Sequence, residues 1–148
     1  MGETETWDFP KPFVMSILVQ ADAIDHYGHV NNAVYVNWLQ EVAWRQIAAE
    51  GISLHDYQQW QCALVVRQHC LDYLLPAYLG DHLQLATWIT RCDERWALQR
   101  TFQLVRTKDK QTLLRAVSTY NCVTPQGKPR RFPAGLLATY QRLTGDTC

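Results

Sequence analysis

The sequence predicts an α+β fold in which one long helix covers an antiparallel sheet. From position 35 to 50 the apolar residues recur every three or four positions, which is the spacing of an amphipathic helix. One segment before this helix and four after it have the apolar, β-branched or alternating character of strands. The connections between the later strands are too short for the crossovers that parallel strands need, so neighbouring strands are expected to be antiparallel.

The first half of the chain supplies a strand and then the helix. Residues 13–20 are short and apolar enough for a strand, and they end just before a polar motif. The helical pattern starts at Tyr35 and continues to about Glu50, and Gly51 is expected to end it. A polar, glutamine-rich stretch at residues 54–61 follows.

The second half is expected to be a meander of long strands. Its breaks at residues 76–81, 93–94 and 108–110 look like tight connections between antiparallel neighbours. Alternating polarity gives each strand one apolar face, which the helix would cover. A turn at residues 125–129 and a short final helix at residues 133–143 complete the pattern. The expected strands are residues 63–75, 82–93, 96–108 and 111–123.

Composition limits the class of protein. A chain of 148 residues with 47% hydrophobic residues is the size of one domain with its own core, so residues 1–148 are expected to form a single domain. Its 14 basic and 14 acidic residues give a net charge of zero, which does not favour a nucleic-acid or membrane-surface partner. Five cysteines without a C-x-x-C pair indicate free thiols in a reducing compartment. We therefore expect a soluble, cytoplasmic protein.

The most chemically specific segment is residues 25–35, Asp-His-Tyr-Gly-His-Val-Asn-Asn-Ala-Val-Tyr. It lies between the first expected strand and the helix. Asp25 can act as a base or a nucleophile, and Gly28 permits a close backbone turn. Asn31 or Asn32 can cap the helix, whose free N–H groups would face a substrate carbonyl. These residue types suit an active site.

This segment resembles the D-x-x-G-H-V-N-N-x-x-Y signature of the hotdog-fold acyl-CoA thioesterases, in the broad family around 4-hydroxybenzoyl-CoA thioesterase. The resemblance implies an antiparallel sheet wrapped around one long central helix, and hydrolysis of an acyl-CoA thioester without a cofactor or a metal. It implies that Asp25 is the general base or nucleophile and that a backbone N–H near Asn32 is the oxyanion donor. His29 either lines the site, as in relatives with the same motif, or is a loop histidine that bonds the backbone. The further residues expected at the substrate site are Gly28, Asn31 and Tyr35.

The motif does not assign the chain to one branch of this family. The His-Val-Asn-Asn form is more similar to aliphatic acyl-CoA thioesterases and plant acyl-carrier-protein thioesterases than to the 4-hydroxybenzoyl-CoA branch. The plant enzymes place an asparagine two residues after the aspartate, where this chain has Tyr27, so their full catalytic set is not carried over. Three alternatives stay open: an acyl-carrier-protein thioesterase, a non-catalytic acyl-CoA-binding module, and a dehydratase that uses His29.

The resemblance also implies partners. Hotdog domains usually pair into a homodimer or a homotetramer, with the site between subunits. An acyl-CoA substrate would bring phosphates, for which two basic clusters are candidates. These clusters are Arg91 with Arg95, and Lys128 with Arg130 and Arg131.

Overall fold

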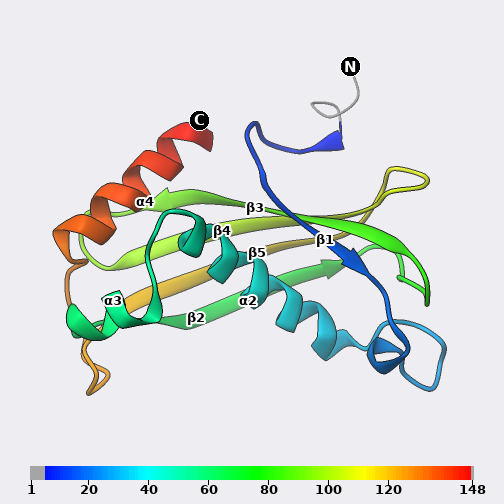
Figure 1. Cartoon of the computed structure of the whole chain (residues 1–148), viewed down its shortest axis with the longest axis horizontal. Coiled ribbons are helices and arrows are strands. Elements are labelled where there is room, and N and C mark those ends of the chain that lie inside the picture. Colours follow the sequence, from blue (N-terminus) through cyan, green and yellow to red (C-terminus); the bar gives the residue numbers. More distant parts are fainter. Residues whose placement is uncertain (1–5, 148) are drawn as a thin grey trace.

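An antiparallel sheet of five strands and three α-helices make up the described part of the protein, residues 6–147 of a computed structural model (Figure 1). This confirms the α+β prediction. In chain order the elements are β1 (Phe13–Leu18), the 3-10 helix η1 (Ala21–Ala23), α2 (Asn32–Ala49), α3 (Leu54–Gln59), β2 (Ala63–Tyr73), β3 (His82–Cys92), β4 (Ala97–Arg106), β5 (Gln111–Val123) and α4 (Ala134–Thr147).

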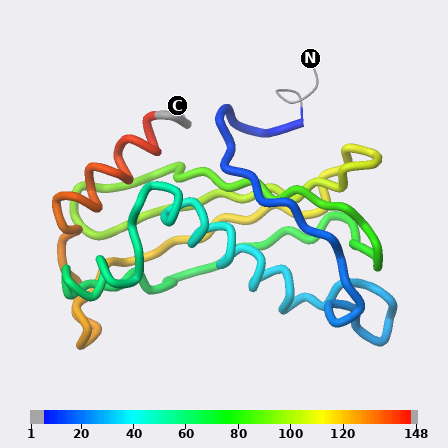
Figure 2. The backbone as a smooth tube through the Cα atoms, viewed as in Figure 1, coloured from blue at the N-terminus to red at the C-terminus, as the bar shows by residue number. Residues whose placement is uncertain are grey.

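The strand order is β1-β3-β4-β5-β2. The turns at residues 93–94 and 108–110 join antiparallel neighbours, as predicted. The prediction that residues 76–81 join neighbours is wrong, because β2 pairs with β5, from Ala63 against Val123 to Tyr73 against Leu114. The chain therefore passes from one edge of the sheet across two strands before it enters β3 (green in Figure 2). Proline and Gly-Asp mark a change of direction, but they do not specify which strands it joins.

Helix α2 begins three residues before the predicted start. The side chain of Asn31 accepts a hydrogen bond from the N–H of Ala33 at 2.9 Å, which satisfies one of the free donors of the first turn. Gly51 ends the helix in a left-handed conformation, φ 81°. Leu39 and Val42 are buried against the sheet in the larger apolar cluster. The amphipathic pattern thus folds as predicted.

The stretch at residues 54–59 is helical, which its polarity did not indicate. Ser53 and Asp56 form a capping box: the serine hydroxyl accepts from the N–H of Asp56, and the Asp56 carboxylate accepts from the N–H of Ser53 at 2.8 Å. The signal was the serine with an acid three residues later. Helices α3 and α4 join a second buried cluster, where the hydroxyls of Tyr57 and Tyr140 lie 2.9 Å apart.

The two faces of the sheet differ in what covers them. Along β4, Leu98, Phe102 and Leu104 are buried in the apolar clusters on the helix-covered face, as the alternation predicts. In β3 the opposite face is buried too, because the chain before β1 crosses it. There the indole N–H of Trp88 donates to the carbonyl of Pro10 at 3.0 Å.

Strand β2 forms an edge of the sheet and pairs on one side only. Over its 11 residues, Ala63 to Tyr73, none is fully buried. Its exposed apolar side chains include Val65, Val66 and Tyr73. Among the described helices, none is both long enough and apolar enough to cross a membrane.

Candidate active site

The Asp25 motif forms a closed loop between η1 and α2. The N–H of Asp25 donates to the carbonyl of His29 at 2.8 Å, and the N–H of Gly28 donates to the carbonyl of Asp25 at 3.1 Å. Gly28 has a φ of 84°, in the left-handed region that favours glycine. The carboxylate oxygen Oδ1 of Asp25 accepts from the N–H of Tyr27 at 2.9 Å and of His29 at 3.3 Å. One oxygen of the carboxylate is therefore fixed by the backbone.

The loop leads directly into the first turn of α2. Val30 is buried and its N–H donates to the carbonyl of Ala77 at 3.1 Å. Asn31 is the N-cap, and its own N–H donates to the carbonyl of Ala23 at 2.8 Å. The next N–H, of Asn32, has no acceptor within the described residues. This donor and the carboxylate of Asp25 thus lie at opposite ends of one anchored loop.

The crossover segment at residues 76–81 supports this loop. The N–H of Ala77 donates to the hydroxyl of Tyr35 at 3.2 Å. The rings of His29 and Tyr78 meet edge to face, with centroids 5.3 Å apart. Burial raises the pKa of Tyr35 and outweighs the opposing effect of the Ala77 hydrogen bond, so its hydroxyl stays protonated. The segment at residues 76–81, for which the predicted strand pairing is wrong, is therefore part of the candidate site.

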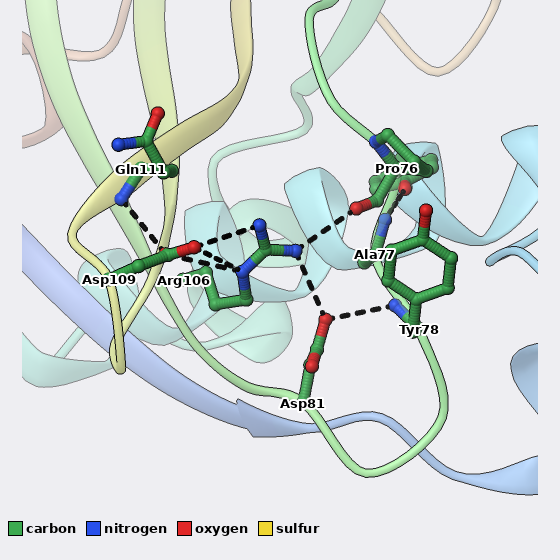
Figure 3. Close-up of polar contacts among 8 residues, drawn as sticks. Pro76, Ala77, Tyr78, Asp81, Arg106, Asp109 and Gln111 are labelled. Carbon is green, nitrogen blue, oxygen red and sulfur yellow. Dashed lines mark hydrogen bonds and ion pairs between the residues drawn. The ribbon is translucent and has the colours of Figure 1, made fainter.

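Arg106, at the end of β4, holds the crossover segment (Figure 3). Its Nη1 donates to the carbonyl of Pro76 at 3.3 Å and to the carboxylate of Asp81 at 3.4 Å, while its Nη2 donates to Asp109 at 3.0 Å. The same oxygen of Asp81 accepts from the N–H of Tyr78 at 3.0 Å. The Asp109 hydrogen bond raises the pKa of Arg106. Sequence reasoning missed this arginine, because nothing in a strand-ending Arg indicates a distant loop.

The structure brings most of the predicted site residues together. The imidazole of His29 is exposed, and only its backbone N–H contacts the Asp25 carboxylate. Tyr35 is buried, with 4% of its surface exposed, and packs edge to face on Tyr73 of β2 at 5.4 Å. Tyr73 also donates from its hydroxyl to the carbonyl of Asn32 at 3.4 Å. Edge strand β2 thus ends at the start of α2, beside the motif.

A cavity of about 610 Å³ lies farther along α2. Its walls come from the C-terminal half of α2, from α3, from the first residues of β2 and from β4, β5 and α4. Gln40 is the first α2 residue that lines it, eight positions after Asn32, or about 12 Å along the helix axis. Most of the lining side chains are apolar or aromatic, but Arg100 is among them.

The two basic clusters differ in what they contact. The guanidinium of Arg130 donates to the carbonyls of Trp60 at 2.6 Å and of Arg131 at 2.9 Å, so it holds the loop before α4. Arg91 and Arg95 are exposed at the turn between β3 and β4. Arg131 is exposed as well, so Arg130 is the member of these clusters whose guanidinium is taken up by the structure.

Comparisons with known proteins agree on the family. The profile of the thioesterase-like superfamily matches residues 19–139. A curated relative, the long-chain acyl-CoA thioesterase FadM of Escherichia coli (strain K12), is 27% identical over 111 residues, which are 72% of this chain and 80% of FadM.

Solved structures share the fold. A 1,4-dihydroxy-2-naphthoyl-CoA thioesterase from Synechocystis superposes with a TM-score of 0.79 at 21% identity, covering 92% of this chain and 97% of that one. A Staphylococcus aureus protein solved in complex with CoA superposes with a TM-score of 0.86 at 18% identity, covering 96% and 89%. The family match and the sheet order together confirm the predicted hotdog fold and thioesterase class: the chain belongs to the thioesterase-like superfamily.

Proposed function

We propose that the protein hydrolyses acyl-CoA thioesters to the free acid and CoA, with Asp25 as general base or nucleophile. The observation that carries this proposal is the anchoring of one carboxylate oxygen by two backbone N–H groups. The other oxygen, Oδ2, has no hydrogen-bond partner among the described residues. It is available either to attack the thioester carbon or to take a proton from water.

The backbone N–H of Asn32 is the proposed oxyanion donor. It lies at the N-terminus of an 18-residue helix, where the aligned peptide dipoles favour negative charge. Because no acceptor within the described residues occupies it, it is free to bind the thioester oxygen as charge develops there. Donors of this kind are worth about 3 kcal/mol of barrier. Asn31, Gly28 and Tyr35 then act by fixing the loop and the helix start.

The two routes for Asp25 differ in the bond that forms. Direct attack gives an acyl-aspartyl anhydride and releases the CoA thiolate, and water then hydrolyses the anhydride. General-base catalysis adds water to the thioester carbon, and the tetrahedral intermediate collapses to the acid and the CoA thiolate with no covalent intermediate on the protein. After a single turnover in ¹⁸O water, ¹⁸O on the protein identifies direct attack, because only an anhydride that water opens at its aspartyl carbon leaves the label there.

The test of the assignment is Asp25→Asn. We expect kcat for acyl-CoA hydrolysis to fall at least 100-fold, while CoA and acyl-CoA binding, measured by calorimetry, stays within threefold. Asp22→Asn is the matched control, because Asp22 is an exposed carboxylate three residues earlier, and it should leave kcat unchanged. Wild-type kcat in Asp25→Asn would refute the catalytic assignment. Parallel assays with the same acyl group carried by CoA and by acyl carrier protein show which carrier is used.

We also propose that two copies pair through their β2 edges into a homodimer. An exposed 11-residue edge strand that carries apolar side chains such as Val65 and Val66 is a ready template for pairing with another chain. Antiparallel pairing about the middle of β2 would place the start of one β2 beside Tyr73 and the start of α2 in the other copy. Sedimentation velocity should show a dimer, which Val65→Lys should weaken. A monomeric wild type would contradict this.

A further inference from the structure

Arg100 lies on the helix-covered face of β4 and is buried, with 3% of its surface exposed. Its Nη1 donates to the side-chain oxygen of Gln46 in α2 at 2.5 Å and to the hydroxyl of Thr87 at 3.4 Å. No carboxylate among the described side chains lies within ion-pair distance of it. A full positive charge thus sits in the core with neutral partners only.

A buried charge without a counter-ion is costly, because the group loses its hydration and gains no opposite charge in return. Burial accordingly lowers the pKa of Arg100, although an arginine remains charged at neutral pH. Hydrogen bonds from Nη1 use only part of a guanidinium that has five N–H donors. The remaining N–H groups of the guanidinium can therefore bind an anion that the free protein does not supply.

Arg100 also lines the cavity of about 610 Å³ beside α2. Around it stand apolar and aromatic side chains, among them Trp44, Ile47, Leu64 and Leu98. At roughly 30 Å³ for one water, the cavity holds on the order of twenty water-sized groups, enough for an extended acyl chain. An apolar chamber with one buried cation fits a ligand that is apolar along its length and anionic at one end.

We infer that this cavity holds the acyl group and that Arg100 selects acyl chains whose far end carries a carboxylate. This inference rests on the proposed thioesterase function, since the thioester end of the chain must reach the Asp25 loop. Gln46 and Thr87 hold the guanidinium in place and leave the edge formed by Nε and Nη2 for a paired carboxylate. A chain ending in a methyl group would bury the same apolar surface but leave the charge unpaired.

The first test uses free ligands and does not depend on hydrolysis. Dodecanedioate, dodecanoate and 1-dodecanol are titrated calorimetrically into the otherwise intact Asp25→Asn protein. We expect both carboxylates to bind at least tenfold more tightly than the alcohol, and Arg100→Met in the same background to abolish this difference. Equal binding of acid and alcohol to the protein with Arg100 present would overturn carboxylate recognition whatever the outcome of the activity assays.

The second test separates the two sources of the carboxylate. For ω-carboxydodecanoyl-CoA against dodecanoyl-CoA, we expect a kcat/KM ratio of at least 10 in the wild type and below 1 in Arg100→Met. A wild-type ratio at or below 1, with dodecanoate still bound, would show that the cavity binds free fatty acid and would overturn the substrate assignment.

The substitution of Arg100 by Met is chosen to leave the protein folded. Replacing a buried charge with an apolar side chain of similar size is often neutral or stabilising, and circular dichroism checks the fold. Arg100→Lys keeps the charge without the planar fork and should retain an intermediate preference. Arg115→Met is the control, because Arg115 pairs with Asp8 on the opposite face of the sheet; it should leave the substrate ratio unchanged.

Discussion

Removing the Arg106 side chain should loosen the crossover segment without touching the Asp25 motif. In Arg106→Met, the carbonyl of Pro76 and the carboxylate of Asp81 lose a charged donor. Asp81 keeps only the N–H of Tyr78 among these contacts. The side chains of Arg106 and Asp81 are 13% and 12% exposed, so water replaces the lost donor poorly.

The magnitude follows from these two contacts. A hydrogen bond to a charged group contributes about 1.5–3 kcal/mol, and the distances of 3.3 and 3.4 Å place each contact at or below the lower end. Together they give a loss of about 2 kcal/mol. For a chain of 148 residues, this lowers Tm by about 4–8 °C. The exposed pair with Asp109 adds little to this figure.

Differential scanning calorimetry measures the stability change, and acyl-CoA hydrolysis at 20 °C measures the effect on the site while both proteins are folded. We expect kcat/KM to fall about tenfold, since small displacements of positioning groups are costly in rate. Arg115→Met removes a more exposed ion pair on the opposite sheet face and should change kcat/KM less than twofold. An Arg106→Met protein with unchanged Tm and activity would falsify the bracing role of this arginine.

Three further outcomes are expected. Burial raises the pKa of Tyr57 and Tyr140 and of the Cys62, Cys92 and Cys122 thiols in the folded state. The unfolded chain therefore loses cysteine protons above about pH 8.5 and tyrosine protons above about pH 10 that the folded chain keeps. Urea titrations should show a free energy of unfolding that begins to fall near pH 8.5 and falls more steeply beyond pH 10, and a level profile to pH 11 would contradict this. Burial raises the pKa of the Cys122 thiol to about 12, so iodoacetamide at pH 8 should leave it unmodified in native protein and modify it in urea, as mass spectrometry of the peptides would reveal. Gly28→Ala, at a φ of 84° with open space around the Cβ position, should cost about 1 kcal/mol by backbone strain alone, and no change in Tm would show that the loop adapts.

The local elements were predictable because their signals are local. The helix spacing of α2 and the alternation in β4 depend only on which side chains face the core, and both appear in the structure within a few residues of the predicted bounds. The capping box of α3 is equally local, at Ser53 and Asp56. A serine followed by an acid three residues later predicts a helix start, which the polarity of the stretch does not indicate.

The pairing of β2 with β5 was not predictable in the same way. It joins residues 63–73 to residues 114–123, and no turn chemistry connects strands that are so far apart in sequence. The bracing of the Asp25 loop depends on this pairing, since the crossover segment lies where Val30 and Tyr35 can bond it only when β2 ends beside α2. Arg106 could not be placed at the site until that connection was known.

The buried arginine was nevertheless visible as an anomaly in the pattern. The helix-facing positions of β4 are Leu98, Arg100, Phe102 and Leu104, and an arginine in such a row conflicts with the alternation that otherwise predicts the strand. A sequence shaped by stability alone would place an apolar residue there, because replacing a buried charge with an apolar side chain is often neutral or stabilising. Conflicts of this kind are expected at functional sites. The position of Arg100 in the cavity wall therefore favours a task in ligand recognition over one in holding α2 to the sheet.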